Sequence, residues 1–348
     1  MITIGLDVGN GSIGMAVAVP EGTVVSNTYP SVFAAYSGTT GVPMPGRTTV
    51  MPADVFTFEN RDYVLGYESI QLASATPIGA FDREDRLYRR EFQTLTKLAL
   101  LDAATMATND DIIEVNLVLG APVEDFTPDK IGELKRWFTQ PVVGAKNGRQ
   151  IVVRLRDVEV ISQPAAVLMD AYLNDQGYVA DEAIAHGRVL VIDSGSGTLD
   201  LTDFEELKIL RQFSDPVGMN DVYRTLMEVI QAAEPKARVN LYDLEHQLRR
   251  QDHSPHTVYQ FGRFHMDLTD ARTRAMNDTW EHMVDAISTR FPDRLVFSRV
   301  LLAGGAGDAF RSYFQSWMPA IEAVSEPQLA VARGLCKYGV LLWAEVPA

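Results

Sequence analysis

The sequence has little cysteine, no long apolar run and fewer basic than acidic residues. Its single cysteine, Cys336, excludes a disulfide within the chain and a metal cluster built on several cysteines. Cys336 lies in an apolar stretch with helical spacing, so we expect a small core residue rather than a nucleophile. Without a run long enough to cross a bilayer, no membrane contact is expected. Because Met1 leads directly into strand sequence, we also expect no signal peptide and a cytoplasmic location.

The charge balance limits the partners of the chain. The 348 residues include 46 acidic and 31 basic side chains, which gives a formal net charge of −15. Such a surface repels the phosphate backbone of nucleic acids, so direct binding to DNA or RNA is not expected. If the protein acts on DNA, a separate adaptor protein should make the contact. The length is sufficient for two domains that each have a core.

Two segments, residues 4–13 and 190–199, share one pattern. In each, an apolar run ends in an aspartate, Asp7 or Asp193, and Gly-x-Gly-Ser/Thr follows before further apolar residues. This pattern predicts a β-hairpin whose glycine turn exposes backbone N–H groups that can surround a phosphate. An aspartate at the end of the strand is suited to hold the magnesium ion that accompanies a phosphate. Two such hairpins suggest duplicated domains that close on one Mg-nucleotide.

Residues 9–14 also match the GxGxxG fingerprint of dinucleotide-binding proteins. That fingerprint requires a helix directly after the glycines and an acidic residue about twenty positions further on. Here a strand-like apolar run follows and ends at Pro20, and the region around residues 29–31 has no carboxylate. The context therefore disfavours a Rossmann domain. A chance similarity between the two hairpins is the simpler alternative, and the rest of the chain weakens it.

Apolar spacing and turn residues predict the remaining elements. Strands are expected over residues 2–7, 15–19, 23–28, 115–122, 151–155, 158–161 and 298–303, with hairpins over 55–66 and 188–213. Helices are expected over residues 90–106, 127–138, 162–172, 219–233, 240–250, 269–290, 309–317 and 328–344. The basic run Arg83, Arg86, Arg89 and Arg90 alternates with acidic residues, which is typical of a charged helix face. A filament or partner contact is the second interpretation of that run.

Five segments in this order resemble the nucleotide pocket of the actin, sugar-kinase and heat-shock-chaperone superfamily. They are residues 6–12, 162–172, 192–200, 302–307 and 330–339. Within that superfamily, the sequences Leu-Asp-Val-Gly-Asn-Gly at 6–11 and Ala-Arg-Gly-Leu-Cys-Lys-Tyr-Gly at 332–339 are most similar to bacterial and archaeal actin-like proteins of the ParM type. The resemblance extends from residue 4 to about residue 340, although the matching residues are few.

The resemblance implies an α/β fold, namely the actin-like (ribonuclease H-like) duplicated two-domain fold around a nucleotide cleft. Actin-like domain I would comprise residues 1–175, including a small subdomain at about 30–85. Domain II would comprise residues 176–325, and a C-terminal helix at 326–348 would return to domain I.

The resemblance also implies a filament-forming ATPase that segregates plasmid DNA through a DNA-binding adaptor. The protein would bind ATP, or GTP, with Mg²⁺, assemble with copies of itself and hydrolyse the nucleotide. Asp7 and Asp193 would hold Mg²⁺ through water, and Gln163 would orient the attacking water, as glutamines do in other nucleotide hydrolases. The residues expected to bind the nucleotide are Gly9, Asn10, Gly11, Ser12, Gly195, Ser196, Gly197, Thr198, Gly218, Gly304, Gly305 and Gly307.

One departure from the family pattern leaves two alternatives open. In actins and many relatives the first hairpin ends with a lysine that contacts the phosphates, and Gly14 stands there in this chain. The change puts tight triphosphate binding and fast hydrolysis in doubt and leaves a non-hydrolysing scaffold open as one alternative. The other is a small-molecule kinase of the same superfamily, for which the chain offers no clear carboxylate base. Within residues 37–46, we expect Val42 and Met44 to insert into the next subunit of a filament. The alternative is that both side chains pack onto their own domain.

Overall fold

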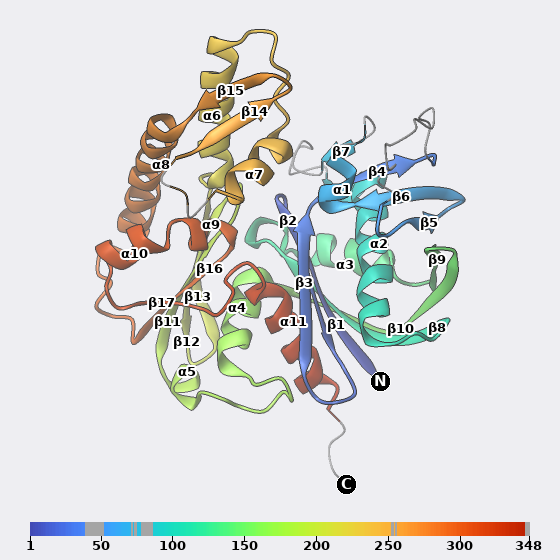
Figure 1. Ribbon diagram of the computed structural model, residues 1–348. Helices are drawn as coiled ribbons and strands as arrows, with labels where there is room; N and C mark the ends of the chain where they lie inside the picture. The colour runs from blue at the N-terminus through green and yellow to red at the C-terminus, as the bar shows by residue number, and fades with distance from the viewer. Residues whose placement is uncertain are drawn as a thin grey trace. The chain divides into compact units, whose positions relative to one another are not determined.

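The computed structural model describes residues 1–38, 52–70, 72, 75–77, 86–251, 254 and 256–344 (Figure 1). Val42 and Met44, which we expect at a filament contact, lie outside these residues, as does Arg83. The chain divides into two compact units, Met1–Ala180 with Val331–Ala348, and Asp181–Ala330. No helix in the described part of the chain is long and apolar enough to cross a membrane.

The first unit is built on a ten-stranded sheet with the order β3-β2-β1-β8-β10-β9-β5-β6-β4-β7. Its strands are β1 (Ile2–Val8), β2 (Ser12–Ala18), β3 (Val24–Pro30), β4 (Val32–Tyr36), β5 (Phe56–Phe58), β6 (Arg61–Leu65), β7 (Ala75–Pro77), β8 (Ile112–Ala121), β9 (Val142–Lys146) and β10 (Arg149–Ser162). Its helices are α1 (Gly66–Ile70), α2 (Arg90–Ala107), α3 (Pro128–Arg136), α4 (Gln163–Tyr172) and α11 (Ala330–Leu342), with short 3₁₀ turns η2 (Arg86–Tyr88) and η3 (Val123–Asp125).

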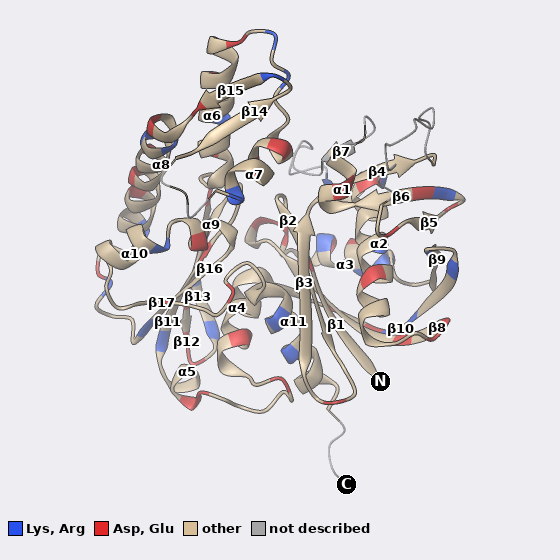
Figure 2. Cartoon of the chain, in the orientation of Figure 1, with Lys and Arg blue, Asp and Glu red and all other residues tan. Residues whose placement is uncertain are grey.

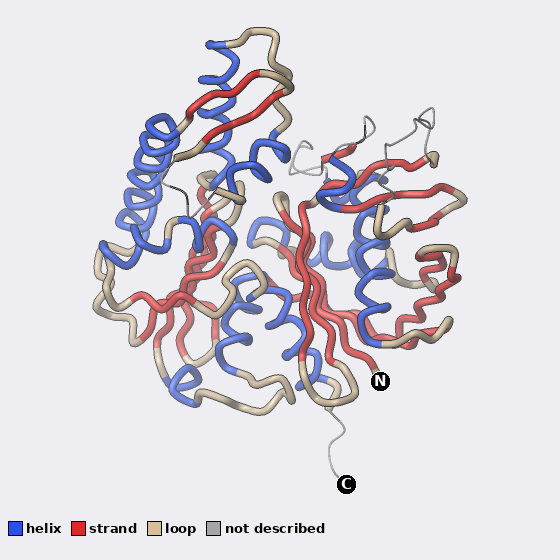
Figure 3. Tube along the Cα trace, in the orientation of Figure 1, coloured by secondary structure: helices blue, strands red, loops and turns tan. Residues whose placement is uncertain are grey.

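Strand β1 lies inside the sheet, antiparallel to β2 and parallel to β8. Ile4 and Leu6 point to one face, where they share a hydrophobic core with α2. Gly5 points to the other face, where a Cβ atom would lie only 2.3 Å from the backbone oxygen of Ala332 in α11. The glycine therefore permits α11 to pack directly on the strand, and Figure 3 shows α2 and α11 as separate helices against this sheet. By strand alternation, Asp7 lies on the same face as Gly5.

Helices α4 and α11 cross at close range. A Cβ on Gly334 of α11 would lie 1.7 Å from the backbone oxygen of Ala166 in α4, so only glycine fits the crossing. Basic residues of α11, blue in Figure 2, pair with α4. Asp170 accepts from Arg333 Nη2 at 2.6 Å, and Lys337 Nζ lies 2.9 Å from Asp170 Oδ1. These buried charges are paired, as burial requires.

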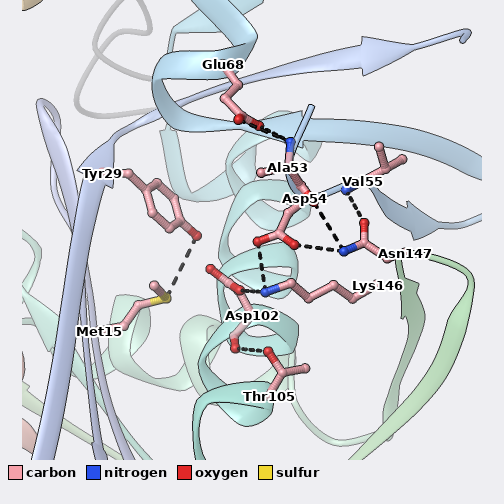
Figure 4. Close-up of polar contacts among 10 residues, drawn as sticks. All are labelled: Met15, Tyr29, Ala53, Asp54, Val55, Glu68, Asp102, Thr105, Lys146 and Asn147. Carbon is pink, nitrogen blue, oxygen red and sulfur yellow. Dashed lines mark hydrogen bonds and ion pairs between the residues drawn. The ribbon is translucent and has the colours of Figure 1, made fainter. Parts of the chain in front are cut away.

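A polar cluster around Lys146, at the end of β9, joins three segments of the first unit (Figure 4). Lys146 Nζ lies 2.8 Å from Asp102 Oδ1 of α2 and 3.0 Å from Asp54 Oδ2. Asn147 donates to Asp54 Oδ1 at 2.9 Å and accepts from the Val55 backbone N–H at 2.8 Å. Burial raises the pKa of Asp102 although the lysine opposes this shift. The cluster fixes the segment before β5 to the main sheet and to α2.

The second unit repeats this plan with a five-stranded sheet in the order β13-β12-β11-β16-β17. Its strands are β11 (Arg188–Ser194), β12 (Leu199–Glu205), β13 (Lys208–Asp215), β16 (Arg299–Ala303) and β17 (Ile321–Ala323), and β14 (Val258–Phe261) and β15 (Phe264–Asp267) form a separate hairpin. Its helices are α5 (Glu182–His186), α6 (Met219–Ala233), α7 (Leu241–Arg249), α8 (Thr269–Arg290), α9 (Gly305–Ala309) and α10 (Arg311–Trp317). In both units, three consecutive strands pair antiparallel, and the first of them also pairs parallel with a later strand. The strand orders are β3-β2-β1-β8 and β13-β12-β11-β16. This repetition is the predicted duplication.

Three sequence predictions are corrected by the structure. Residues 151–161 form one strand, β10, rather than two, because a bulge between Leu155 and Asp157 bends the strand without ending it. The helix expected over 309–317 begins two residues later, as α10 at Arg311, and a separate short helix, α9, occupies residues 305–309 before it. Arg86, expected on a solvated helix face, is 4% exposed and belongs to a 3₁₀ turn.

Candidate functional site

The first glycine turn connects β1 to β2 and is closed by a hydrogen bond from Gly9 N to Ser12 O at 3.0 Å. Ser31, which is fully buried, forms two hydrogen bonds to the turn. Its hydroxyl donates to Gly9 O at 2.6 Å, and its backbone N–H donates to Gly11 O at 3.0 Å. The carbonyl oxygens of Gly9 and Gly11 are thereby bonded within the protein. The predicted residues Gly9, Asn10, Gly11 and Ser12 are all only half-buried.

Asp7 and Gln163, 156 residues apart in the sequence, lie in contact. Gln163 begins α4, and its side-chain amide donates to Asp7 Oδ1 at 2.6 Å. The structure thus places together the two residues of this unit that the sequence assigned to magnesium and water. Gly120 makes room for the pair, because a Cβ there would lie 3.3 Å from Asp7 Oδ1. Burial raises the pKa of Asp7 to about 6, although the Gln163 hydrogen bond and the charge of Arg86 lower it.

The second glycine turn, between β11 and β12, has the same closing hydrogen bond, from Gly195 N to Thr198 O at 2.8 Å. The N-terminus of α6 lies against this turn. A Cβ on Gly218, the residue before the helix, would lie 2.6 Å from Gly195 O, and Asn220 N donates to Ser196 O at 2.7 Å. Gly218 is therefore required by close approach. The first N–H groups of α6 are bonded within the protein, since Met219 N donates to Gly195 O and Gly218 N donates to Asp221 Oδ2 at 3.0 Å.

Asp193 is the next-to-last residue of β11 and is 7% exposed. Gly304 follows the parallel neighbour β16 and has a left-handed backbone, with φ of 85°. A Cβ on Gly304 would lie 2.5 Å from Asp193 Oδ1 and 2.2 Å from Ser194 O. Gly307 lies one turn further on, beside Leu302. Within the second unit, the structure thus brings the predicted loop of residues 304–307 against the predicted aspartate.

The neighbours of Gly305 were not predicted from the sequence. A Cβ on Gly305 would lie 3.7 Å from Arg249 Nη2 and 3.7 Å from Gln328 Cδ. Arg249 donates to Gln328 Oε1 at 3.0 Å and pairs with Glu245 at 2.9 Å. Burial raises the pKa of Glu245, opposed by Arg249. The i,i+4 spacing of Glu245 and Arg249 could have indicated an ion pair on a helix. Such pairs also occur on ordinary helix surfaces, so the spacing alone does not point to a binding site.

Two glutamines, Gln247 in α7 and Gln251 just after it, connect this helix to β14. Gln247 accepts from Gln260 N and donates to Gln260 O, both at 2.9 Å. Gln251 makes the same pair of bonds with Val258, both at 2.8 Å. The two glutamine side chains therefore pair with the edge of β14 as a further strand would. This fixes the orientation of the helix that carries Glu245 and Arg249.

The donor set fits magnesium held through water. In the described part of the chain, no group of three or more His, Cys, Asp and Glu side chains is arranged to hold a metal. Mg²⁺ does not need one, since it usually keeps several waters and binds one or two carboxylates together with substrate phosphates. Asp7 is a suitable carboxylate because burial disfavours its ionised form and raises its pKa, and a cation beside it would stabilise that form.

The comparisons with known proteins concern the fold of the chain and its N-terminal domain. Residues 5–165 match the family model for the N-terminal domain of actin-like proteins. No curated protein matches the chain in sequence. A structure of an archaeal actin homologue has a TM-score of 0.73 at 17% identity, and the alignment covers 97% of this chain and 99% of that one.

Two ParM structures are similar to the same extent. A 15-stranded ParM filament from Clostridium botulinum has a TM-score of 0.73 at 16% identity, covering 97% of this chain and 98% of its own. Bacillus thuringiensis ParM with ATP has a TM-score of 0.70 at 14% identity, covering 99% and 100%. The chain therefore has the actin-like fold, and the predicted resemblance is confirmed.

Proposed function

We propose that this protein of actin-like fold binds a nucleoside triphosphate with Mg²⁺ and assembles into filaments in response. The observation that carries the proposal is the duplicated glycine turn, closed by the same hydrogen bond at Gly9–Ser12 and at Gly195–Thr198. Each turn lies at the end of a buried strand whose aspartate is near the turn. The similar structures include ParM with ATP and a ParM filament, which supports both parts of the proposal.

In this proposal the two turns bind the phosphates through backbone N–H groups. Asp7 and Asp193 hold Mg²⁺ through water, and the ion supplies charge neutralisation to the phosphates. Gln163, oriented by Asp7, positions the attacking water through its remaining carbonyl oxygen. Glu245 and Arg249, beside Gly305, contact the nucleoside. Hydrolysis would then destabilise the filament, and an adaptor protein would connect it to plasmid DNA.

Two measurements on the purified protein test the proposal. Right-angle light scattering should rise on addition of ATP and Mg²⁺, and phosphate release should follow. Scattering that rises without phosphate release would favour the scaffold, for which Gly14, opposite Asp7 in the hairpin, is the supporting observation. Phosphorylation of an added sugar or acid would favour the kinase. Absence of nucleotide binding by calorimetry would overturn the proposal.

Asp193→Ala tests whether the proposed magnesium ligand of the second unit is required for hydrolysis. We expect phosphate release at saturating ATP to be abolished, because the carboxylate that orients magnesium and its waters is lost. Circular dichroism should show an unchanged fold. Turnover near the wild-type rate would remove Asp193 from the site.

A further inference from the structure

Arg86 is a buried cation in contact with the first glycine turn. It is 4% exposed and lies in η2, directly before α2. Its Nη1 donates to Asn10 Oδ1 at 2.7 Å, while Nε and Nη2 donate to Asp125 Oδ2 at 3.1 and 2.7 Å. A planar guanidinium held on two sides in this way has a fixed orientation, which a lysine would not reproduce.

The partner of Arg86 does not cancel its charge completely. Asp125 Oδ1 also lies 2.7 Å from Lys130 Nζ, so one carboxylate serves two cations. These three side chains together carry a formal charge of +1 beside the turn. The charge of Arg86 also acts on Asp7, since it lowers the pKa of that carboxyl.

The hydrogen bond to Asn10 determines what the turn presents to a ligand. An amide has an acceptor oxygen at one end and two N–H donors at the other. Because the oxygen of Asn10 accepts from Arg86, the N–H donors are directed away from the guanidinium. Donors attract a phosphate, whereas an exposed amide oxygen would repel it. The residue opposite Asp7 in the hairpin is Gly14, which contributes no side chain to this task.

We propose that Arg86 is the positioning residue for phosphate recognition in this protein: it orients Asn10 so that its amide N–H groups face the phosphates, and it supplies positive charge behind the turn. The proposal rests on nucleotide binding as proposed above. It accounts for the absence of a basic side chain at position 14, because the cation comes from a segment 76 residues away from the turn.

The test measures affinity as a function of phosphate number. Equilibrium binding of ATP, ADP and adenosine is compared by calorimetry for the wild type, Arg86→Met and Asn10→Ala. We expect ATP affinity to fall about tenfold or more in both variants, in line with the loss of a charge-assisted hydrogen bond. Adenosine affinity should stay within about twofold. A purely structural role would weaken ATP and adenosine by the same factor.

Two further variants sharpen the result. Lys130→Met, like Arg86→Met, removes one positively charged partner of Asp125. The Lys130 side chain is 24% exposed, and the structure shows no hydrogen bond from it to Asn10. Because this variant also lowers the positive charge beside the turn, it should reduce the preference for ATP over adenosine, but by no more than about threefold. In the double variant Arg86→Met/Asn10→Ala, the loss should not exceed the larger single loss, because the two residues act through one contact.

The outcomes separate the two proposals. If the wild type binds ATP no tighter than adenosine, phosphate recognition fails and the proposed function falls with it. If the wild type prefers ATP and both variants keep that preference, only the role of Arg86 is overturned. Should Arg86→Met unfold because Asp125 loses a buried partner, Asn10→Ala, in a half-buried turn, still decides the result.

Discussion

Gln163, which donates a hydrogen bond to Asp7, is the residue whose substitution most directly tests the proposed hydrolysis. In Gln163→Ala both glycine turns can still bind the phosphates, whereas the amide that would orient the attacking water is removed. We expect phosphate release to slow by tenfold or more, equivalent to about 1.4 kcal/mol in the barrier. ATP affinity should change by less than about threefold, and filaments should persist longer. Normal phosphate release with an unchanged filament lifetime would make Gln163 an ordinary first residue of α4.

The reactivity of Cys336 with a thiol reagent measures whether the first unit is folded. The thiol is fully buried in α11, and burial raises its pKa to about 12 although nearby backbone hydrogen bonds lower it. At pH 8 the folded protein should therefore react with a thiol reagent at least about a hundredfold more slowly than the unfolded chain. Labelling followed by absorbance, with and without urea, measures both rates. Complete labelling of the native protein within seconds would contradict the described packing of α11.

At the scale of the element, the crossing of α4 and α11 depends on one glycine. Gly334→Ala places a methyl group 1.7 Å from Ala166 O, so the helices must separate. We expect a loss of about 2 kcal/mol in the free energy of unfolding, typical of overpacking. Urea unfolding followed by circular dichroism measures it.

A matched glycine in another helix provides the control. Gly132 of α3 is a helical glycine whose added Cβ would meet nothing within 4 Å. Gly132→Ala should therefore stabilise the protein by up to about 1 kcal/mol through helix propensity. Equal unfolding midpoints for the two variants would show that α11 does not approach α4 as closely as described.

Local patterns account for the elements that the sequence predicted well. The helices α6 and α8 have the predicted bounds, and both glycine turns lie at the predicted positions, because apolar periodicity and glycine placement are readable within a few residues. That Asp7 and Gln163 belong to one site was implied only by the resemblance, since 156 residues separate them, and their direct hydrogen bond was not predicted.

Arg86 shows where local patterns fail. Its sequence neighbours carry charges of both signs, as on a solvated helix. Its structural partners, Asp125 and Asn10, are 39 and 76 residues away. Nothing in a short window distinguishes a buried arginine from an exposed one when the pairing carboxylate is distant. The same holds for Ser31, whose two hydrogen bonds to the first turn connect residues far beyond any turn motif.

At the scale of the whole molecule, the net charge of −15 opposes assembly. Subunits of like charge repel over a range set by the Debye length, which is about 30 Å at 0.01 M salt and about 8 Å at 0.15 M. Added salt therefore screens the repulsion between neighbouring copies in a filament. We expect the critical concentration for ATP-dependent assembly to fall as monovalent salt rises from about 0.01 to about 0.15 M.

The measurement needs a fixed nucleotide state, because salt also weakens phosphate binding. Critical concentrations are taken by sedimentation with a non-hydrolysable ATP analogue at saturation, and saturation is checked by calorimetry at each salt concentration. A critical concentration that rises with salt would show that attractive ion pairs across the subunit contact outweigh the overall repulsion. In that case the exposed basic residues, although outnumbered, would be concentrated at the contact, and charge reversal of exposed pairs such as Arg90 with Glu59 would be the next variants to measure.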